Sequence, residues 1–206
     1  MRKRLLFFIF GLMSMIILHA KKIDGIIIYN SDSISHVTFD IKVTTLLQEI
    51  DYKSLQNKVK YYNLSNKKIK LIPDQIKEIQ FKYEGEDVRM ISCKDNLNLT
   101  SNNCILLKIK IDGKLKLYTH YASQGPVGMY TGPGSKWRGN SGDVEIFTLQ
   151  KKNGNLFRPR LRHFIEDMKE YLSDCPILIE KIDKKTYTID SIDQIVKDYN
   201  SCTSKE

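Results

Sequence analysis

The spacing of apolar and polar residues divides the chain into a strand-rich first part and a helical last part. In residues 34–41, Val37, Phe39 and Ile41 alternate with polar residues, which is the period of a half-buried strand. Other short apolar runs are bounded by turn-forming residues, which favours further strands. Strands are expected at residues 26–29, 34–41, 59–62, 69–72, 79–83, 88–93 and 144–149, with one helical turn at 73–76.

A hairpin is expected where CILLKIKIDGKLKLYTH turns at Asp112-Gly113. The hydrophobic pattern favours a three-residue loop that pairs Lys110 with Lys114 and holds Gly113 in the left-handed conformation. This register groups the apolar residues on one face and gathers a basic stripe on the other, made of Lys108, Lys110, Lys114 and Lys116. The stripe is suited to an acidic partner or to anionic lipid headgroups, although a solvated sheet face is the more ordinary interpretation. A third hairpin is expected to join residues 144–149 to 156–160.

From Leu161 onward the apolar spacing becomes helical. One helix is expected from Leu161 to Leu172, and a short one over residues 177–182. Asp190 is expected to cap a last helix that turns its apolar residues inward: Ile192, Ile195, Val196 and Tyr199. Strands followed by helices predict an α+β fold, in which an antiparallel β-sheet or partly open barrel of hairpins precedes two or three C-terminal helices.

The first twenty residues have the layout of a secretory signal peptide. Arg2, Lys3 and Arg4 precede an apolar run over residues 5–18, and Ala20 ends it. Removal after Ala20 is expected, and an uncleaved anchor is the alternative because Leu18 is larger than the residue preferred there. The mature chain, 21–206, is expected to be one domain, β-rich over 21–160 and helical over 161–202. We expect a periplasmic or secreted protein. A lipoprotein is not expected, because no cysteine follows the cut, and no second apolar run is long enough to span a membrane.

The net charge of the chain is positive but does not indicate a particular partner. The chain carries a net charge of +9, and without the three signal-peptide cations it keeps 30 cations against 24 acids, or +6. The two signs are interspersed, so a solvated surface is favoured over binding to nucleic acid.

Four cysteines, Cys93, Cys104, Cys175 and Cys202, fit disulfides in an exported chain. Three pairings are possible. Cys93–Cys104 and Cys175–Cys202 are favoured because each joins near neighbours in the expected architecture. A metal site is the weaker alternative, since no Cys-x-x-Cys or closely spaced histidine pair is present.

The most unusual segment is GPVGMYTGPGSKWRGNSG, residues 125–142. It matches neither a phosphate-binding loop nor a dinucleotide fingerprint, so no cofactor is predicted. Its aromatic and basic residues are suited to contact a glycan or an envelope protein: Tyr130, Lys136, Trp137 and Arg138. Alternatively the segment folds back over the sheet edge.

The segments FIEDMKEYLSDCPILIEKI and YTIDSIDQIVKDYNSC resemble the C-terminal signature of a group of exported Bacteroidetes proteins of unknown function. GIIIYNSDSI and IPDQIKEIQFKY fit the same group. The resemblance implies export and supports pairing Cys175 with Cys202, but it carries no established activity. It also implies O-glycosylation at Asp-Ser-hydrophobic sites, of which Ser33 is the better candidate and Ser191 the weaker.

The histidines of the mature chain, His36, His120 and His163, are scattered and form no recognised catalytic motif. A non-catalytic binding module of the cell envelope is therefore the favoured function. The alternatives are an exported hydrolase with a site that the sequence does not reveal, and a purely structural envelope component.

Overall fold

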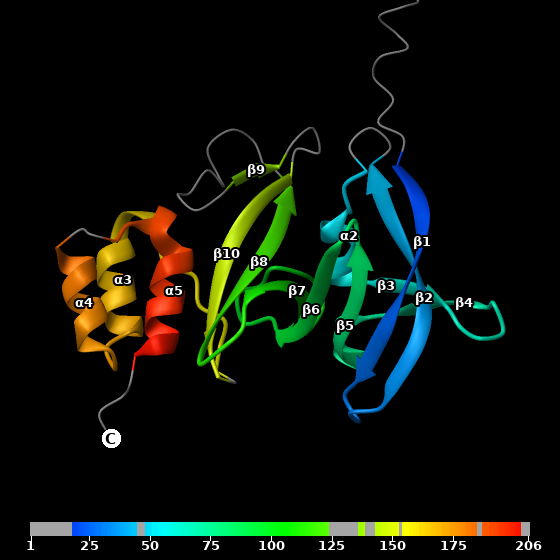
Figure 1. Cartoon of the computed structure of the whole chain (residues 1–206), viewed down its shortest axis with the longest axis horizontal. Helices are drawn as coiled ribbons and strands as arrows, with labels where there is room; N and C mark the ends of the chain where they lie inside the picture. Colours follow the sequence, from blue (N-terminus) through cyan, green and yellow to red (C-terminus); the bar gives the residue numbers. More distant parts are fainter. Residues whose placement is uncertain are drawn as a thin grey trace, which may run out of the picture.

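A computed structural model describes residues 18–44, 48–123, 136–138, 143–152, 154–184 and 187–202 (Figure 1). Within these residues, ten antiparallel strands form one sheet in the order β4-β3-β2-β1-β5-β6-β7-β8-β10-β9. The strands are β1 (Leu18–Tyr29), β2 (Ile34–Thr44), β3 (Val59–Tyr62), β4 (Lys68–Leu71), β5 (Ile76–Tyr83), β6 (Glu86–Lys94), β7 (Cys104–Ile111), β8 (Leu115–Ser123), β9 (Lys136–Arg138) and β10 (Asp143–Lys151).

The α-helices are α2 (Tyr52–Asn57), α3 (Phe164–Tyr171), α4 (Pro176–Asp183) and α5 (Ile192–Ser201), and the 3₁₀ turns are η1 (Pro73–Gln75), η3 (Leu161–His163) and η4 (Ile189–Ser191). Helices α3, α4 and α5 follow the sheet, as the sequence predicts, whereas α2 lies between β2 and β3. The α+β fold class is therefore confirmed. Helix α2 is not among the elements that the sequence analysis expects, and the residue before α5 is Ser191 rather than Asp190.

Two groups of helices cover the same face of the sheet. Leu117 packs with α3, α4 and α5, whereas Tyr121 belongs to the cluster around α2, where it stacks on Tyr52 with ring centroids 4.9 Å apart. Leu117 and Tyr121 are four positions apart in β8, so they point to the same side. The opposite face carries a third buried cluster, which contains Cys93, Ile105, Leu107, Tyr118 and Leu156.

Side-chain amides complete the main-chain pairing of β8. Strands β7 and β8 pair only from Lys108↔Thr119 to Ile111↔Leu117. Beyond one end, Gln56 of α2 donates to the carbonyl of Tyr121 (2.9 Å) and accepts from its N–H (2.5 Å). Beyond the other, Asn200 of α5 makes the same two bonds to Leu115, at 2.9 and 2.8 Å. Each amide thus occupies the place of a missing strand residue and ties its helix to the sheet.

The predicted register of the Asp112-Gly113 hairpin is wrong. Ile109 pairs with Tyr118, not with Leu115, and an irregularity follows between Ile109 and Ile111. Among the described glycines only Gly85 has a positive φ, so Gly113 does not adopt the left-handed conformation. A Cβ at Gly113 would lie 2.5 Å from the Asn200 amide nitrogen, so the turn leaves room for that side chain. Because both faces of this hairpin are covered, its hydrophobic pattern cannot select the register.

The predicted basic stripe does not form. Lys108 pairs with Glu86 (2.7 Å), Lys110 pairs with Asp193 of α5 (2.7 Å), and Lys114 donates to the carbonyl of Cys202. The third predicted hairpin is also incomplete. Within residues 156–160, only Phe157 bridges to the sheet, at Leu149.

One of the two predicted disulfides is present. Cys175, directly before α4, is bonded to Cys202, directly after α5, with 6.3 Å between their Cα atoms. Cys93 and Cys104 remain thiols, so that predicted pairing is wrong. Cys93 lies opposite Ile105 and Cys104 opposite Lys94, an offset of one residue that sends the two sulfurs to opposite faces of the sheet.

Candidate functional site

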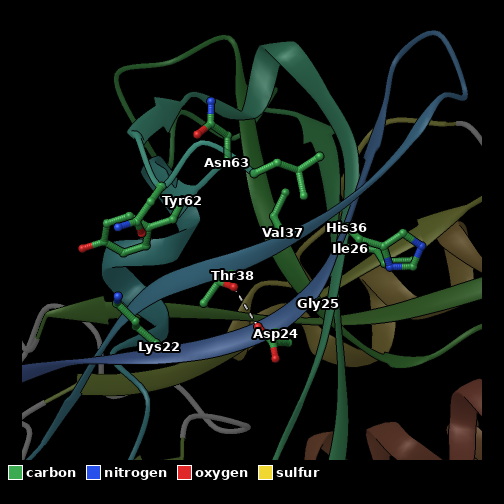
Figure 2. A pocket seen from close by; sticks show the side chains of 11 residues that line it. Lys22, Asp24, Gly25, Ile26, His36, Val37, Thr38, Tyr62 and Asn63 are labelled. Atoms are coloured by element: carbon green, nitrogen blue, oxygen red, sulfur yellow. Dashed lines mark hydrogen bonds between the residues drawn. The ribbon is translucent and has the colours of Figure 1, made fainter.

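A groove of about 660 Å³ lies on the outer side of β1 and β2, against the β3–β4 hairpin (Figure 2). The side chains that give it its chemistry are Lys22, Asp24, His36, Thr38, Tyr62 and Asn63. They combine the ring of Tyr62 with several hydrogen-bonding groups, which are the kind of groups that fix the orientation of a bound ligand.

Strand register positions these side chains. Asp24 lies opposite Thr38, and Thr38 lies opposite Tyr62, so the three form a row across β1, β2 and β3. The Thr38 hydroxyl donates to a carboxylate oxygen of Asp24 at 2.8 Å, a bond that Figure 2 marks.

Gly25 makes the close packing beneath this row possible. A Cβ at this position would lie 2.3 Å from the carbonyl oxygen of Gln80 and 2.6 Å from the ring of Phe39. Only glycine avoids both clashes, which lets β1 lie close against β5 and Phe39 fill the core below. The sequence pattern alone does not reveal this requirement.

Two cations approach the ring of Tyr62. The Lys22 ammonium lies 4.6 Å and the Lys68 ammonium 5.8 Å from the ring centroid, both within the range of a cation–π contact. Lys68 also forms an ion pair with Asp40, which is buried, and that hydrogen bond raises the pKa of the Lys68 ammonium. Lys68 is therefore held in place, whereas the exposed Lys22 makes no ion pair with any described residue.

The hairpin beside the groove is strongly basic. Between Asp51 and Asp74 the sequence contains six lysines and no acidic residue: Lys53, Lys58, Lys60, Lys67, Lys68 and Lys70. Lys60, Lys67 and Lys70 form no ion pair with the described residues, in contrast to lysines elsewhere such as Lys108 and Lys169. Most of the net positive charge of the mature chain is thus concentrated in this segment, which we call the basic hairpin (residues 58–71).

The basic hairpin is not among the sites predicted from the sequence, although the clustering of its lysines is a property of the sequence. The stretch between Asp51 and Asp74 contains no acidic residue, which by itself indicates a basic surface. The predicted basic surface is instead the set of lysines around Asp112, because the expected hairpin register puts them on one face. Lys108 and Lys110 form ion pairs in the structure, whereas within the basic hairpin only Lys68 forms one with a described residue.

The structure describes three of the four residues predicted to contact a glycan or an envelope protein. Tyr130 lies outside the described residues. Lys136, Trp137 and Arg138 form β9, a short edge strand whose backbone pairs with β10, with Trp137 opposite Val144. This part of the segment is therefore a strand and not an open loop.

Ser33 lies exposed in the turn between β1 and β2. Its hydroxyl is 2.9 Å from that of Ser31, and its carbonyl accepts the N–H of Tyr29. The side chain is accessible to a modifying enzyme, but no contact in the structure indicates that it is modified.

A second group of polar residues is buried on the sheet face opposite the helices. Burial, reinforced by the neighbouring Arg158, lowers the pKa of His120 to about 4. Burial raises the pKa of the Cys93 thiol to about 11. Both side chains are less than a tenth exposed, so a neutral imidazole and a protonated thiol lie closed off from substrate. The pair is suited to packing and not to nucleophilic catalysis.

The described residues contain no group of three or more His, Cys, Asp or Glu side chains able to hold a metal ion. Within the same residues, no helix has both the length and the apolar character needed to cross a bilayer. Comparison of the chain with protein families, curated proteins and solved structures finds no match.

Proposed function

We propose that this protein is an exported binding module of the cell envelope, and that the groove and the basic hairpin together recognise an anionic ligand. The observation that carries the proposal is the juxtaposition of a groove of about 660 Å³ with lysines that lack carboxylate partners among the described residues. Unpaired cations beside a concave polar surface attract negative charge and raise its local concentration.

The groove adds specific contacts to the electrostatic attraction of the lysines. Tyr62 offers an aromatic surface, and the amides of Asn63 and Asn66 offer both donors and acceptors. Asp24 is the acid of the groove, and one of its oxygens already accepts from Thr38. The surface therefore favours an anion that also carries hydrogen-bonding groups.

Export is supported by two independent features. The N-terminal twenty residues have the pattern of a signal peptide, and Cys175–Cys202 is a disulfide of the kind that persists in oxidising compartments. The resemblance of the C-terminal segment to exported Bacteroidetes proteins points the same way. The predicted contacts of Tyr130, Lys136, Trp137 and Arg138 with an envelope protein or glycan remain a separate proposal.

The test is binding of the mature chain to immobilised dextran sulfate, measured by surface plasmon resonance at low and high salt. We expect salt-sensitive binding that Lys60→Gln/Lys67→Gln/Lys70→Gln weakens strongly, because each substitution removes one attraction between an ammonium group and the polyanion. The matched control, Lys169→Gln/Lys181→Gln/Lys184→Gln, removes the same charge at the opposite end of the molecule, on α3, on α4 and directly after α4 (Figure 1). Equal losses in both triple variants, or no binding by the unmodified chain, would refute the proposal.

A further inference from the structure

The tip of the basic hairpin exposes a leucine completely. Leu64 has a relative exposure of 101%, the highest of the large apolar side chains in the described residues. An isolated exposed apolar residue needs no explanation by itself. Its position does, because it lies at the end of a two-stranded projection and not within a packed surface (Figure 1).

The turn that carries Leu64 is fixed by hydrogen bonds. The N–H of Asn66 donates to the carbonyl of Asn63 at 2.8 Å, and the N–H of Lys67 donates to the side-chain oxygen of Asn63 at 2.9 Å. Asn66 has a φ of 55°, in the left-handed region that asparagine tolerates better than most residues. The backbone therefore holds the leucine outward.

Positive charge surrounds the leucine on both strands. Tyr62 pairs with Lys68, and Lys60 pairs with Lys70, so these four side chains share the outer face of the hairpin. Lys67 adjoins the turn and is exposed. The tip thus presents one apolar side chain, several ammonium groups and, farther back, an amphipathic tyrosine.

The combination of leucine, lysines and tyrosine favours an anionic bilayer over a soluble polyanion. A soluble polyanion attracts the lysines but offers nothing to a fully exposed leucine. An anionic bilayer matches all three parts, because apolar side chains enter the acyl boundary, tyrosine favours the headgroup level, and lysines approach lipid phosphates.

We infer that the basic hairpin docks reversibly on an anionic lipid surface, with Leu64 inserted beneath the headgroups. The inference rests on the proposed function, since it names a phospholipid surface as the anionic ligand. Contact through one apolar residue and a few lysines is shallow and sensitive to salt. It leaves the C-terminal helices, at the other end of the molecule in Figure 1, directed away from the membrane.

The experiment is co-sedimentation of the mature chain with vesicles of phosphatidylcholine, with and without phosphatidylglycerol. We expect binding only when phosphatidylglycerol is present, and a loss of binding at high salt. Leu64→Asn should reduce the vesicle partition coefficient about tenfold, as expected for losing burial of one leucine side chain. The triple variant at Lys60, Lys67 and Lys70 should reduce it about fivefold for each lysine.

Ile177→Asn is the matched control, because Ile177 is 71% exposed on α4 at the far end of the molecule. It should bind vesicles as the unmodified chain does. Equal vesicle binding by Leu64→Asn and the unmodified chain would refute the insertion of Leu64. Equal loss of binding in Leu64→Asn and Ile177→Asn would refute docking through the basic hairpin. Binding to dextran sulfate without binding to vesicles would overturn lipid docking and leave the proposed function intact, whereas binding to neither would overturn both.

Discussion

At the scale of single residues, the face of the sheet opposite the helices buries an imidazole beside a guanidinium. The Arg158 guanidinium lies 3.3 Å from the Nδ1 atom of His120, and His120 is 6% exposed. A proton on the imidazole would place two cations together where water cannot screen them. The carboxylate of Asp95 favours that proton, but its influence is smaller than those of burial and Arg158.

This arrangement predicts a loss of stability in acid. The pKa of His120 falls from 6.5 in a free imidazole to about 4 in the folded chain, so the unfolded state binds the proton more readily. The contribution of neutral His120 is therefore complete above pH 6.5 and is lost as the pH falls toward about 4, a change of about 3 kcal/mol. Urea unfolding across this range should show a shallower pH dependence for His120→Gln. A His36→Gln control, altered at an exposed residue of the groove, should retain the original slope, and an unchanged slope in His120→Gln would contradict the assignment.

At the scale of elements, side-chain amides attach helices to strands. Gln56 joins α2 and Asn200 joins α5 to the two ends of β8, and each amide uses both its donor and its acceptor. Asn96 does the same for the segment after β10, donating to the Leu156 carbonyl at 2.9 Å and accepting from its N–H at 2.8 Å. These bonds replace the strand pairing that is missing at those positions.

Asn200→Asp tests this attachment with almost no change in size. A carboxylate can still accept from the N–H of Leu115, but it cannot donate to the Leu115 carbonyl and would face it with negative charge. We expect a loss of about 1 to 3 kcal/mol in the free energy of unfolding, measured by urea denaturation at neutral pH. Asn98→Asp, at an exposed turn residue, should change stability by only a few tenths of a kcal/mol. Equal effects of the two substitutions would show that the Asn200 amide does not support the fold.

Apolar–polar alternation predicts the buried face of some strands but not the register of others. Val37, Phe39 and Ile41 in β2 are buried, as their alternation predicts, because polar residues separate them and mark one face of the strand as the core face. Strands β7 and β8 have buried residues on both faces, such as Leu106 beside Leu107 and Leu117 beside Tyr118, so alternation does not distinguish one register from the next. The one-residue offset between Cys93 and Cys104 follows from the pairing of β6 with β7 and excludes the disulfide that the expected closeness of the two residues favoured.

At the scale of the whole molecule, one disulfide and two thiols occupy different environments. Cys175–Cys202 closes the helical end, whereas Cys93 is buried and Cys104 is half-buried within the sheet. The helical end therefore depends on a covalent link, and the sheet does not.

Intact mass spectrometry of the protein exported from a bacterial host tests this distribution together with the proposed signal peptide. We expect the chain to begin at Lys21, two cysteines to react with iodoacetamide in denaturant, and four to react after reduction. Peptide mapping should place the first two labels on Cys93 and Cys104. Four labelled cysteines before reduction, or a chain that begins at Met1, would contradict the disulfide and the export proposal respectively.

Some properties of the candidate site are present in the sequence, and others arise only when the strands pair. The stretch without acids, from Lys53 to Lys70, is a property of the chain itself, as is the aromatic character of Tyr62. That Asp24, Thr38 and Tyr62 stand in one row depends on three strands meeting in register. Long-range register cannot be read from local periodicity, because every antiparallel alignment of the same parity satisfies the same pattern.

The sequence by itself determined that strands come before the C-terminal helices, the α+β class and the inward faces of β2 and α5, because these follow from local periodicity. Only the tertiary structure decided which strands are neighbours, which lysines form ion pairs with a carboxylate, and which cysteines form a disulfide. Those outcomes depend on contacts between residues far apart in the chain. In the basic hairpin, the absence of such contacts is what leaves Lys60, Lys67 and Lys70 without an ion-pair partner among the described residues and Leu64 fully exposed.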